Sequence, residues 1–479
     1  MPRRPTPNSA FAALAIGVAS LALLQNLVIP VIPMIQHELG VTAEAASWTM
    51  TAWLIAAAVA TPVLGRVGDL YGRKRTFLAV LAVGALGDLL AALSPSLEVL
   101  IAARVLQGVG GALFPLAFGL IRDLMPARRI TGAIGAMSAI MAIGGAAGSV
   151  LAGPIAAAVG WRGLFLVPMA ISIVGLVLTA LLVGRTGPAA RGRIAVLPAL
   201  LLSGWLVALL VPLSSGASWG WSSPLTLGLF LLAAMLFAAW IVVELRARQP
   251  LVDIRMLLSP AIWPTNVASI LVGAAAFGFW GFLPQFLEVT AATGWGLGLD
   301  TQAAGLVLLP LLIGVSAIGF VTGSLSRVVP LRAQLAGGGL LMGAAAVAAV
   351  LFHEAAWQLA IAGGVFGIGI GLSYAAAASI IVQSVPADRV GVATGMNANL
   401  RTIGSAIGSA LTATLVFGGV ASASAPPESG FAVAWITTAC LALAGGILVA
   451  VVRPPRRGSA DSAEARIAAE EAVVIAEAP

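Results

Sequence analysis

Two residues of opposite charge lie within long apolar segments of this sequence. Asp88 is in the apolar segment 76–94, and Arg104 is in the next segment, 97–121. Both lie about eight residues from the turn near Ser96, so in a helical hairpin they would reach the same depth, roughly 12 Å from the turn. A charge in apolar surroundings has to be paired or hydrated, and such residues often mark ion or substrate pathways. We therefore expect Asp88 and Arg104 to share an ion pair or a water-filled pocket, with Asp88 as a candidate proton-responsive group in a charge relay; a static structural pair is the alternative.

Polar side chains without an acid group form a second set within the apolar segments. Amides and arginines can hold a substrate by hydrogen bonds, but amides do not carry a proton at physiological pH. A cavity with Arg104 and Arg401 but few acids should favour neutral or anionic amphiphiles over lipophilic cations. The candidate substrate-cavity residues are Gln25, Asn26, Gln107, Asn397 and Arg401. Other residues that could line such a site, although they more often pack or face lipid, are Trp53, Phe114, Trp280, Gln285, Tyr374 and Gln383.

Catalytic and cofactor chemistry finds no support in the sequence. His37 and His353 are both expected at the external side, and Cys440 is the single cysteine, so no metal-ligand cluster or disulfide framework is present. No Gly-Lys loop for nucleotide phosphates occurs, which leaves an ion gradient as the expected energy source. The net charge of +7 is spread over short loops without the basic stripe of a nucleic-acid-binding protein. We expect no catalytic residues, no metal, no cofactor and no nucleic-acid partner.

Apolar segments make up most of the 479 residues and must position these side chains. Hydrophobic residues account for 60% and charged residues for 9% of the chain, and the mean hydropathy is +1.05. A segment of about 20 apolar residues can cross a bilayer as a helix. The sequence thus predicts an all-α integral membrane protein with fourteen transmembrane helices. The predicted spans are residues 11–35, 44–65, 76–94, 97–121, 131–158, 162–184, 194–213, 224–245, 260–288, 302–325, 332–352, 356–384, 389–418 and 430–452.

The distribution of basic residues predicts which ends of these helices are cytoplasmic. Loops on the cytoplasmic side of a membrane carry an excess of Lys and Arg. If the N-terminus is cytoplasmic, nearly all of the 25 basic residues fall on that side; Arg162 is external, and Arg104 and Arg401 lie within spans. Both termini are then cytoplasmic. An interfacial aromatic belt fits the same topology, with Trp48, Trp161, Trp219, Trp221, Trp295 and Trp357 at external ends.

A weak internal repeat relates two parts of the chain. The charged turn 65–75 is echoed by the stretch 323–332, and glycines of the span 131–158 are echoed in the span 389–418 at nearly the same separation. Paired halves are typical of alternating-access transporters, whose substrate site lies near the membrane midplane between the halves. The predicted domains are a cytoplasmic N-terminal tail 1–10, a six-helix bundle 11–190, a two-helix insertion 191–250, a second six-helix bundle 251–452 and a cytoplasmic, disordered tail 453–479.

Three motifs resemble those of the major facilitator superfamily. Gly65-x-x-Gly68-Asp69-x-Tyr71-Gly72-Arg73-Lys74 matches its signature loop, and the stretch 104–110 resembles its fourth-helix motif. Gly148-Ser149-x-x-x-Gly153-Pro154 resembles the motif associated with its antiporters. Fourteen spans in this order are similar to the drug:proton antiporter branch, typified by bacterial multidrug exporters. The resemblance implies a fold of two pseudo-symmetric six-helix bundles with a central two-helix insertion, in a bacterial-type plasma membrane.

The resemblance also implies a conformational latch at the signature loop. Asp69 would face the positive end of the helix that begins near Asp388, and Arg73 would pair with Asp123. Such a cluster would hold the cytoplasmic face shut in the outward-open state and break in the inward-open state. Ordinary positive-inside loop charge is the alternative. The candidate latch residues are Gly65, Gly68, Asp69, Gly72, Arg73, Lys74 and Asp123.

Small residues characterise the antiporter-motif helix, whose candidate residues are Gly144, Gly148, Gly153 and Pro154. Glycines at helical spacing let a facing helix approach closely, and a proline can bend the segment. We expect a sliding surface between the two halves; simple small-residue packing is the alternative. Ser149 stands where the motif usually has proline.

The sequence predicts a secondary active transporter, most specifically a proton-coupled exporter of small amphiphilic compounds. Its partners would be a small-molecule substrate, protons and the lipid bilayer, and a monomer is compatible with the sequence. The stretch 23–27 lacks the acid that fourteen-span antiporters usually place in their first span. This departure and Ser149 keep an importer or metabolite symporter open as the alternative. A non-transporting sensor or scaffold is a third class, disfavoured because no soluble domain would relay a signal.

Overall fold

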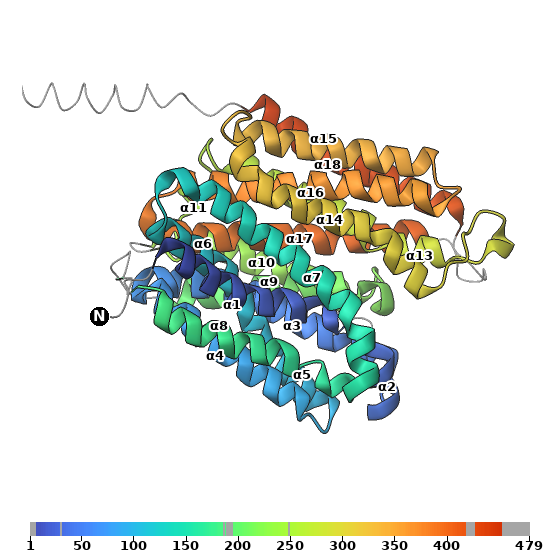
Figure 1. Ribbon diagram of the computed structural model, residues 1–479, viewed down its shortest axis with the longest axis horizontal. Coiled ribbons are helices and arrows are strands. Elements are labelled where there is room, and N and C mark those ends of the chain that lie inside the picture. The colour runs from blue at the N-terminus through green and yellow to red at the C-terminus, as the bar shows by residue number, and fades with distance from the viewer. Residues whose placement is uncertain are drawn as a thin grey trace, which may run out of the picture.

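The computed structural model describes residues 6–28, 31–184, 187, 195–247, 250–417 and 427–452. Within these ranges the regular structure is helical, and the long helices lie side by side along a common direction (Figure 1). Eleven helices of the described part are long and apolar enough to cross a membrane, or twelve if a bent pair formed by residues 151–163 and 166–182 counts as one more span. The all-α membrane fold is confirmed, and fourteen spans fit this arrangement but stay a prediction.

The long helices follow the predicted spans. In the N-terminal part they are α1 (Pro7–Leu27), α3 (Ala43–Tyr71), α4 (Arg73–Ala92), α5 (Leu97–Gly108), α6 (Leu113–Leu124), α7 (Ala127–Gly163), α8 (Leu166–Leu182), α9 (Val196–Trp219) and α10 (Pro224–Arg246). In the C-terminal part they are α12 (Trp263–Trp280), α14 (Thr301–Leu325), α15 (Leu331–Leu351), α16 (Ala356–Ser384), α17 (Val390–Phe417) and α18 (Glu428–Val451). The short helices are α2 (Ile32–Leu39), η2 (Val109–Ala112), α11 (Ile254–Leu257), α13 (Leu283–Glu288), η3 (Ala291–Thr293) and η4 (Ala387–Arg389).

The first predicted span, 11–35, is too long. Helix α1 ends at Leu27, and α2 begins separately at Ile32 with Pro33 in its first turn. Proline lacks a backbone N–H, and its ring clashes with the preceding turn of a helix, so Pro33 suits the first turn of a new helix and not the interior of a continuous one.

The helices pack in two groups with the same internal pattern. In the first group, α1 packs against α7 and α8, α4 against α5 and α8, and α3 against α5. In the second group, α12 packs against α17 and α18, α15 against α16 and α18, and α14 against α16. Figure 1 shows the first group in the lower part of the molecule and the second group in the upper part. The groups meet where α3 contacts α17 and where α7 contacts α14.

The hairpin of α9 and α10 lies at the seam between the groups, because α9 contacts both α3 and α17. Leu202, Trp205 and Leu206 of α9 belong to one buried cluster with Ala58 of α3 and Val392 of α17. The position suits a two-helix insertion between bundles, but the exact domain boundaries stay predictions. The expected boundary at 190–191 and the tail 453–479 lie outside the described residues.

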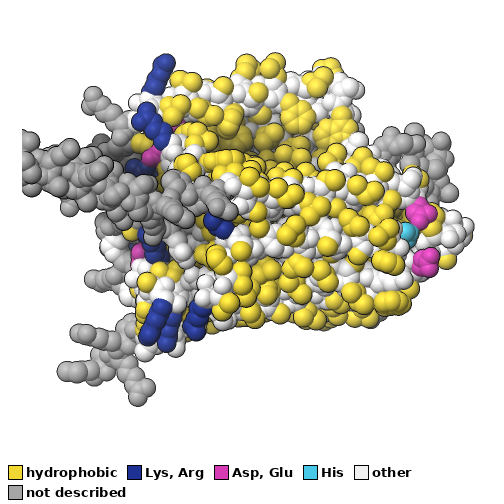
Figure 2. Space-filling model, turned by 90° about the horizontal axis from the view of Figure 1, so that it is seen from above, with side chains coloured by type: hydrophobic (Ala, Val, Ile, Leu, Met, Phe, Trp, Pro, Cys, Tyr) yellow, Lys and Arg dark blue, Asp and Glu magenta, His cyan; other side chains and the backbone are white. Residues whose placement is uncertain are grey.

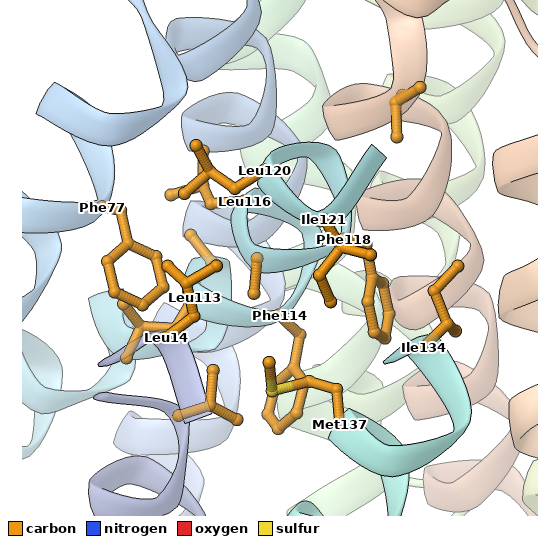
Figure 3. Packing of buried hydrophobic residues seen from close by; sticks show 14 of the residues in the cluster. Leu14, Phe77, Leu113, Phe114, Leu116, Phe118, Leu120, Ile121, Ile134 and Met137 are labelled. Atoms are coloured by element: carbon orange, nitrogen blue, oxygen red, sulfur yellow. The ribbon is translucent and has the colours of Figure 1, made fainter. Parts of the chain in front are cut away.

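Helix α6 is the most enclosed element of the first group. Every residue from Leu113 to Ile121 is buried, as expected for a helix that is apolar on all sides. Figure 3 shows its Leu113, Phe114 and Leu116 among side chains of neighbouring helices, which include Leu14 of α1, Phe77 of α4 and Met137 of α7. This packing fixes the end of α6, where Arg122 and Asp123 lie.

The two ends of the bundle differ in charge. Figure 2 shows Lys and Arg side chains gathered at one end, a broad apolar band in the middle, and Asp, Glu and His side chains at the other end. We call the first the basic end; it carries Arg75, Arg128, Arg246 and Arg327. The opposite end carries Glu38, Asp300, Glu354 and Glu428.

Candidate functional site

The turn between α3 and α4 lies at the basic end and brings the backbone close to two other helices. Gly72 has φ of 104°, a conformation that favours glycine, and its N–H donates to the Gly68 carbonyl at 2.9 Å. A β-carbon at Gly68 would lie 2.3 Å from Leu116 Cδ2 of α6, and one at Gly65 would lie 2.5 Å from the Gly391 carbonyl oxygen of α17. The glycines of the signature loop therefore permit contact with α6 and α17 at the same time.

Asp69 caps the N-terminus of α17 from the opposite group. Its carboxylate is fully buried and accepts hydrogen bonds from the backbone N–H groups of Gly391 and Val392, both at 3.3 Å. The N-terminus of a helix carries unpaired N–H groups and a partial positive charge, so it favours a carboxylate. Asp69 thus lies where the sequence predicts it, against the start of the helix that follows Asp388.

Arg73 joins three helices through one buried guanidinium group. Its Nε and Nη2 donate to Asp69 Oδ1 at 2.9 and 2.7 Å, and its Nη1 donates to Asp123 Oδ1 of α6 at 2.7 Å. Nη2 also donates to the carbonyl of Ala387, in the turn before α17. The predicted pair of Arg73 and Asp123 is present, and the guanidinium also reaches the second group directly. We call Asp69, Arg73 and Asp123 the basic-end cluster.

The described hydrogen bonds of Lys74 go to helix α8. Its Nζ donates to the carbonyls of Ala180 and Val183 at 2.9 and 2.6 Å, at the C-terminal end of α8. A cation is favourable there because the last carbonyls of a helix are unpaired. These contacts lie within the first group, so they fix α4 to α8.

Helices α7 and α14 form a second crossing between the groups at the basic end. A β-carbon at Gly135 of α7 would lie 2.3 Å from the Gly319 carbonyl oxygen of α14, and one at Gly323 would lie 2.2 Å from the Cα of Gly132. Beside this crossing, Arg122 donates to the carbonyls of Val382 and Val385 of the second group at 2.8 and 2.7 Å. The two groups are therefore in direct contact at the basic end at both crossings, α3 with α17 and α7 with α14.

The structure corrects the expected role of the glycines in the antiporter-motif helix. A β-carbon at Gly144 would lie 2.6 Å from the β-carbon of Ala22, and one at Gly148 would lie 2.4 Å from the Leu23 carbonyl oxygen, so both glycines face α1 within their own group. Gly153 has nothing within 4 Å, and Pro154 lies inside α7. The first turns of α7 meet α14 and its later turns meet α1. Gly144 and Gly148 are packing positions, and no sliding surface between the groups runs along them.

Asp88 and Arg104 are joined through an amide and not by a direct ion pair. Gln107 Nε2 donates to Asp88 Oδ1 at 2.8 Å, and Arg104 Nη1 donates to Gln107 Oε1 at 2.7 Å. All three side chains are buried. The sequence predicts Gln107 in the substrate cavity, whereas the structure places it between α4 and α5. These helices approach closely at Gly87, where a β-carbon would lie only 2.9 Å from the Gln107 backbone nitrogen.

Arg104 makes further contacts with α3. Its Nε donates to the Thr49 carbonyl at 3.0 Å, Nη2 contacts Met50 Sδ at 3.7 Å, and the guanidinium carbon lies 5.7 Å from the centre of the Trp53 ring. Arg104 therefore holds α3 and α5 together around the Asp88–Gln107 hydrogen bond.

A small cavity of about 40 Å³ lies between the two groups at mid-height. It is lined from α6, α7, α14, α16 and α17, with Phe114, Phe118, Met141, Tyr374, Asn397 and Arg401 among its residues. Asn397 and Arg401 thus line it as predicted. Asn397 Nδ2 donates to Asn266 Oδ1 at 3.0 Å and to Ser269 Oγ at 2.9 Å, which ties α17 to α12. Binding sites for drug-sized ligands measure roughly 300–1,000 Å³, so the cavity is nearly closed in this conformation.

The other predicted cavity residues are not among the described lining residues. Gln25 lies on α1, and Gln107 is hydrogen-bonded between Asp88 and Arg104. The side chain of Asn26 falls outside what the structure describes. Sequence reasoning missed Ser138 and Thr394, which line the cavity. Small hydroxyl residues within apolar helices commonly bond their own backbone, as both do here, and so give little sequence signal.

Comparison with known proteins identifies relatives over most of the chain. The profile of the Major Facilitator Superfamily matches residues 14–409. The tetracenomycin C resistance and export protein of Streptomyces glaucescens is 29% identical over 86% of this chain and 76% of that protein. The cephamycin export protein CmcT of Amycolatopsis lactamdurans is 30% identical over 88% of this chain and 87% of that protein. Among solved structures, the human organic anion transporter MFSD10 has the same fold, with a TM-score of 0.64 and 13% identity over 93% of this chain and 100% of that chain.

Proposed function

The chain belongs to the Major Facilitator Superfamily of membrane transporters, and we propose that it is a proton-coupled exporter of small amphiphilic compounds that works by alternating access. Membership of this family makes it a multi-pass membrane transporter of small molecules and not an enzyme. In the proposed topology the basic end and both termini face the cytoplasm of a bacterial-type plasma membrane, because basic loops stay on that side.

The basic-end cluster carries the proposed mechanism. Arg73 bonds Asp69 and Asp123 of the first group and the Ala387 carbonyl of the second, and Asp69 bonds the N-terminus of α17. The contacts with the second group are hydrogen bonds between these charged side chains and backbone groups, and a hydrogen bond to a charged group contributes about 1.5–3 kcal/mol. The cluster therefore favours contact between the groups at this end. Rocking the groups apart breaks the hydrogen bonds of the cluster to Ala387 and to the N-terminus of α17, and opens the mid-height cavity to the cytoplasm. The conformation described is then the one closed to the cytoplasm.

We place the proton-responsive group at Asp88. Its carboxylate is buried and bonded to Gln107, which in turn is bonded to Arg104. Protonation removes the negative charge of Asp88, so the charge-assisted hydrogen bond from Gln107 weakens and the charge of Arg104 is no longer balanced. The Arg104 helix, α5, continues through the 3₁₀ turn Val109–Ala112 into α6, which ends at the basic-end cluster. A 3₁₀ segment inside a helix is a common site of bending, and it offers a route from Asp88 to Asp123.

Export is the favoured direction because relatives over most of the chain are named for the export of antibiotics. The absence of an acid in the stretch 23–27 favours the importer or symporter as the second candidate. For either direction, the substrates expected from the cavity are neutral or anionic amphiphiles, because no acid is among its described lining residues.

Transport into inverted membrane vesicles tests the proposal. Inverted vesicles from cells that express the chain are energised so that their interior becomes acidic. They are incubated with tetracenomycin C, the compound that appears in the name of one relative, and with other aromatic amphiphiles. We expect uptake above that of vesicles without the protein, abolished by a protonophore. Asp88→Asn is the matched variant, because asparagine can still accept the Gln107 hydrogen bond but cannot exchange a proton.

Two outcomes would contradict parts of the proposal. Uptake into right-side-out vesicles, in place of inverted ones, would establish import. Uptake that survives both the protonophore and Asp88→Asn would exclude proton coupling through this residue.

A further inference from the structure

Arg401 is a cavity arginine whose guanidinium has no recorded acceptor. It lies on α17 at the mid-height cavity, is half-buried, and its guanidinium carbon lies 4.5 Å from the centre of the Tyr374 ring. Within the described ranges, the structure records no hydrogen bond or ion pair for this guanidinium. The other arginines inside the bundle differ: Arg73 bonds two carboxylates, and Arg104 bonds a carbonyl and an amide.

An unpaired guanidinium inside a membrane bundle is unfavourable, because it presents five N–H donors in surroundings with little water. Stacking on Tyr374 offsets part of this cost through a cation–π interaction. The contact with the ring is not a conventional hydrogen bond, so it leaves N–H donors of the guanidinium available. A planar guanidinium with free edges binds carboxylates through two parallel hydrogen bonds.

The walls around Arg401 specify the rest of the ligand. Phe114, Phe118 and Met141 supply aromatic and apolar surface from the first group, opposite Tyr374 and Arg401 of the second. None of the described lining residues is acidic, so nothing in the cavity competes for the guanidinium or attracts a cation. Arg104 is not among the described lining residues: its guanidinium lies between α3 and α5, where it bonds the Thr49 carbonyl and Gln107.

We propose that Arg401, stacked on Tyr374, binds the carboxylate or a similarly planar oxyanion of an aromatic substrate whose rings lie against Phe114 and Phe118. This inference rests on the proposed function, since it names the substrate class of the same cavity. Because the ligand bridges residues of both groups, its acidic group would also neutralise Arg401 while the groups move past each other.

Direct binding to the purified full chain in lipid nanodiscs tests the assignment without any transport step. The probes are three anthracene derivatives with the same ring: anthracene carboxylate, anthracene methanol and anthracene methylamine. For the unmodified chain we expect the carboxylate to bind about tenfold more tightly than the alcohol and the amine to bind more weakly than the alcohol. Arg401→Gln should remove the preference for the carboxylate while the alcohol binds as before. Arg401→Lys should keep part of the preference, because it keeps the charge but loses the paired donors.

Arg327→Gln is the control, because Arg327 is an exposed arginine at the basic end and away from the cavity. It removes the same charge from the chain and should leave the carboxylate preference unchanged. Equal affinity of the unmodified chain for carboxylate and alcohol would overturn the proposal, as would a carboxylate preference that survives in Arg401→Gln. The binding measurement is independent of the vesicle assay. Selective carboxylate binding without proton-driven uptake would contradict the proposed function and leave the assignment of Arg401 intact. Proton-driven uptake without carboxylate selectivity would contradict the assignment of Arg401 and leave the proposed function intact.

Discussion

Gly65 of α3 and Gly391 of α17 touch backbone to backbone at the basic end. A β-carbon on either glycine would lie 2.5 Å from the carbonyl oxygen of the other. On the far side of the molecule, Gly135 of α7 and Gly319 of α14 repeat this relationship, with distances of 2.3 and 2.9 Å. Each group thus contributes one glycine-containing helix to each crossing, and both crossings must separate before the cavity can open at this end.

Gly65→Ala should separate α3 from α17. The added methyl would overlap a carbonyl oxygen, and overpacking of this kind costs about 1–3 kcal/mol. We expect the closed conformation to lose population, measured as faster labelling of a cysteine introduced at Asp388 beside the crossing. Gly84→Ala is the control, because a β-carbon there meets nothing within 4 Å; labelling at the same rate in both variants would show that the glycine contact does not hold this end closed.

Arg73→Gln should destabilise the protein and open the basic end. The change leaves Asp69 buried without its guanidinium partner, which costs roughly 3–5 kcal/mol. The expected result is a lower melting temperature in detergent and loss of transport. Arg75→Gln removes a basic residue two positions away that is exposed, and it should change neither property. An Arg73→Gln protein as stable and active as Arg75→Gln would contradict the role assigned to the cluster.

Asp88→Asn and Gln107→Leu should separate proton coupling from structure. Asparagine preserves an acceptor for Gln107 but cannot titrate, so we expect a folded protein that binds substrate and has lost protonophore-sensitive uptake. Leucine removes the bridge and leaves a buried carboxylate without its amide partner, which should lower the melting temperature. Unchanged proton-driven uptake in the Asp88→Asn protein would contradict the assignment of Asp88 as the proton-responsive group.

The ion pair of Asp253 and Arg389 should give a pH-dependent contribution to stability. Burial raises the pKa of Asp253, but hydrogen bonds from the Met256 N–H and the Arg389 guanidinium outweigh burial, and the pKa lies below its ordinary value. A carboxyl whose pKa is lowered on folding stabilises the protein above its unfolded pKa of about 3.9, and this contribution disappears as the pH falls through the lowered folded value.

Melting temperatures of Asp253→Asn and the unmodified chain check this prediction. The variant should melt at a lower temperature by a constant amount from neutral pH down to about 4, and the difference should shrink at lower pH. Arg389→Gln should show the same dependence if the pair is the cause. A difference that grows as the pH falls would have the wrong sign for a carboxyl with a lowered pKa.

The fold class could be predicted from the sequence because it depends on local properties, and the contacts of the signature loop could be expected from its resemblance to a known motif. Long apolar segments need no knowledge of their neighbours to be read as membrane helices. The contacts of Asp69 with α17 and of Arg73 with Asp123 were expected because the stretch 65–74 resembles the signature loop of the superfamily, and the structure contains both contacts. The offset between Gly65 and Gly323 likewise indicated two related groups, and both residues lie at crossings between them.

Tertiary structure alone decided how individual side chains are used inside the bundle. Equal depth brought Asp88 near Arg104, but the rotation of α5 about its own axis placed Gln107 between them. The glycines of α7 look alike in sequence, yet the crossing angle sends Gly135 to α14 and Gly148 to α1. Arg104 and Arg401 could not be distinguished as buried cations from the sequence. In the structure each nitrogen of the Arg104 guanidinium contacts a neighbouring group, whereas Arg401 faces a cavity. Hydropathy fixes how deep a residue lies in the membrane, whereas its partner depends on helix rotation and crossing, which are set by contacts between residues hundreds of positions apart.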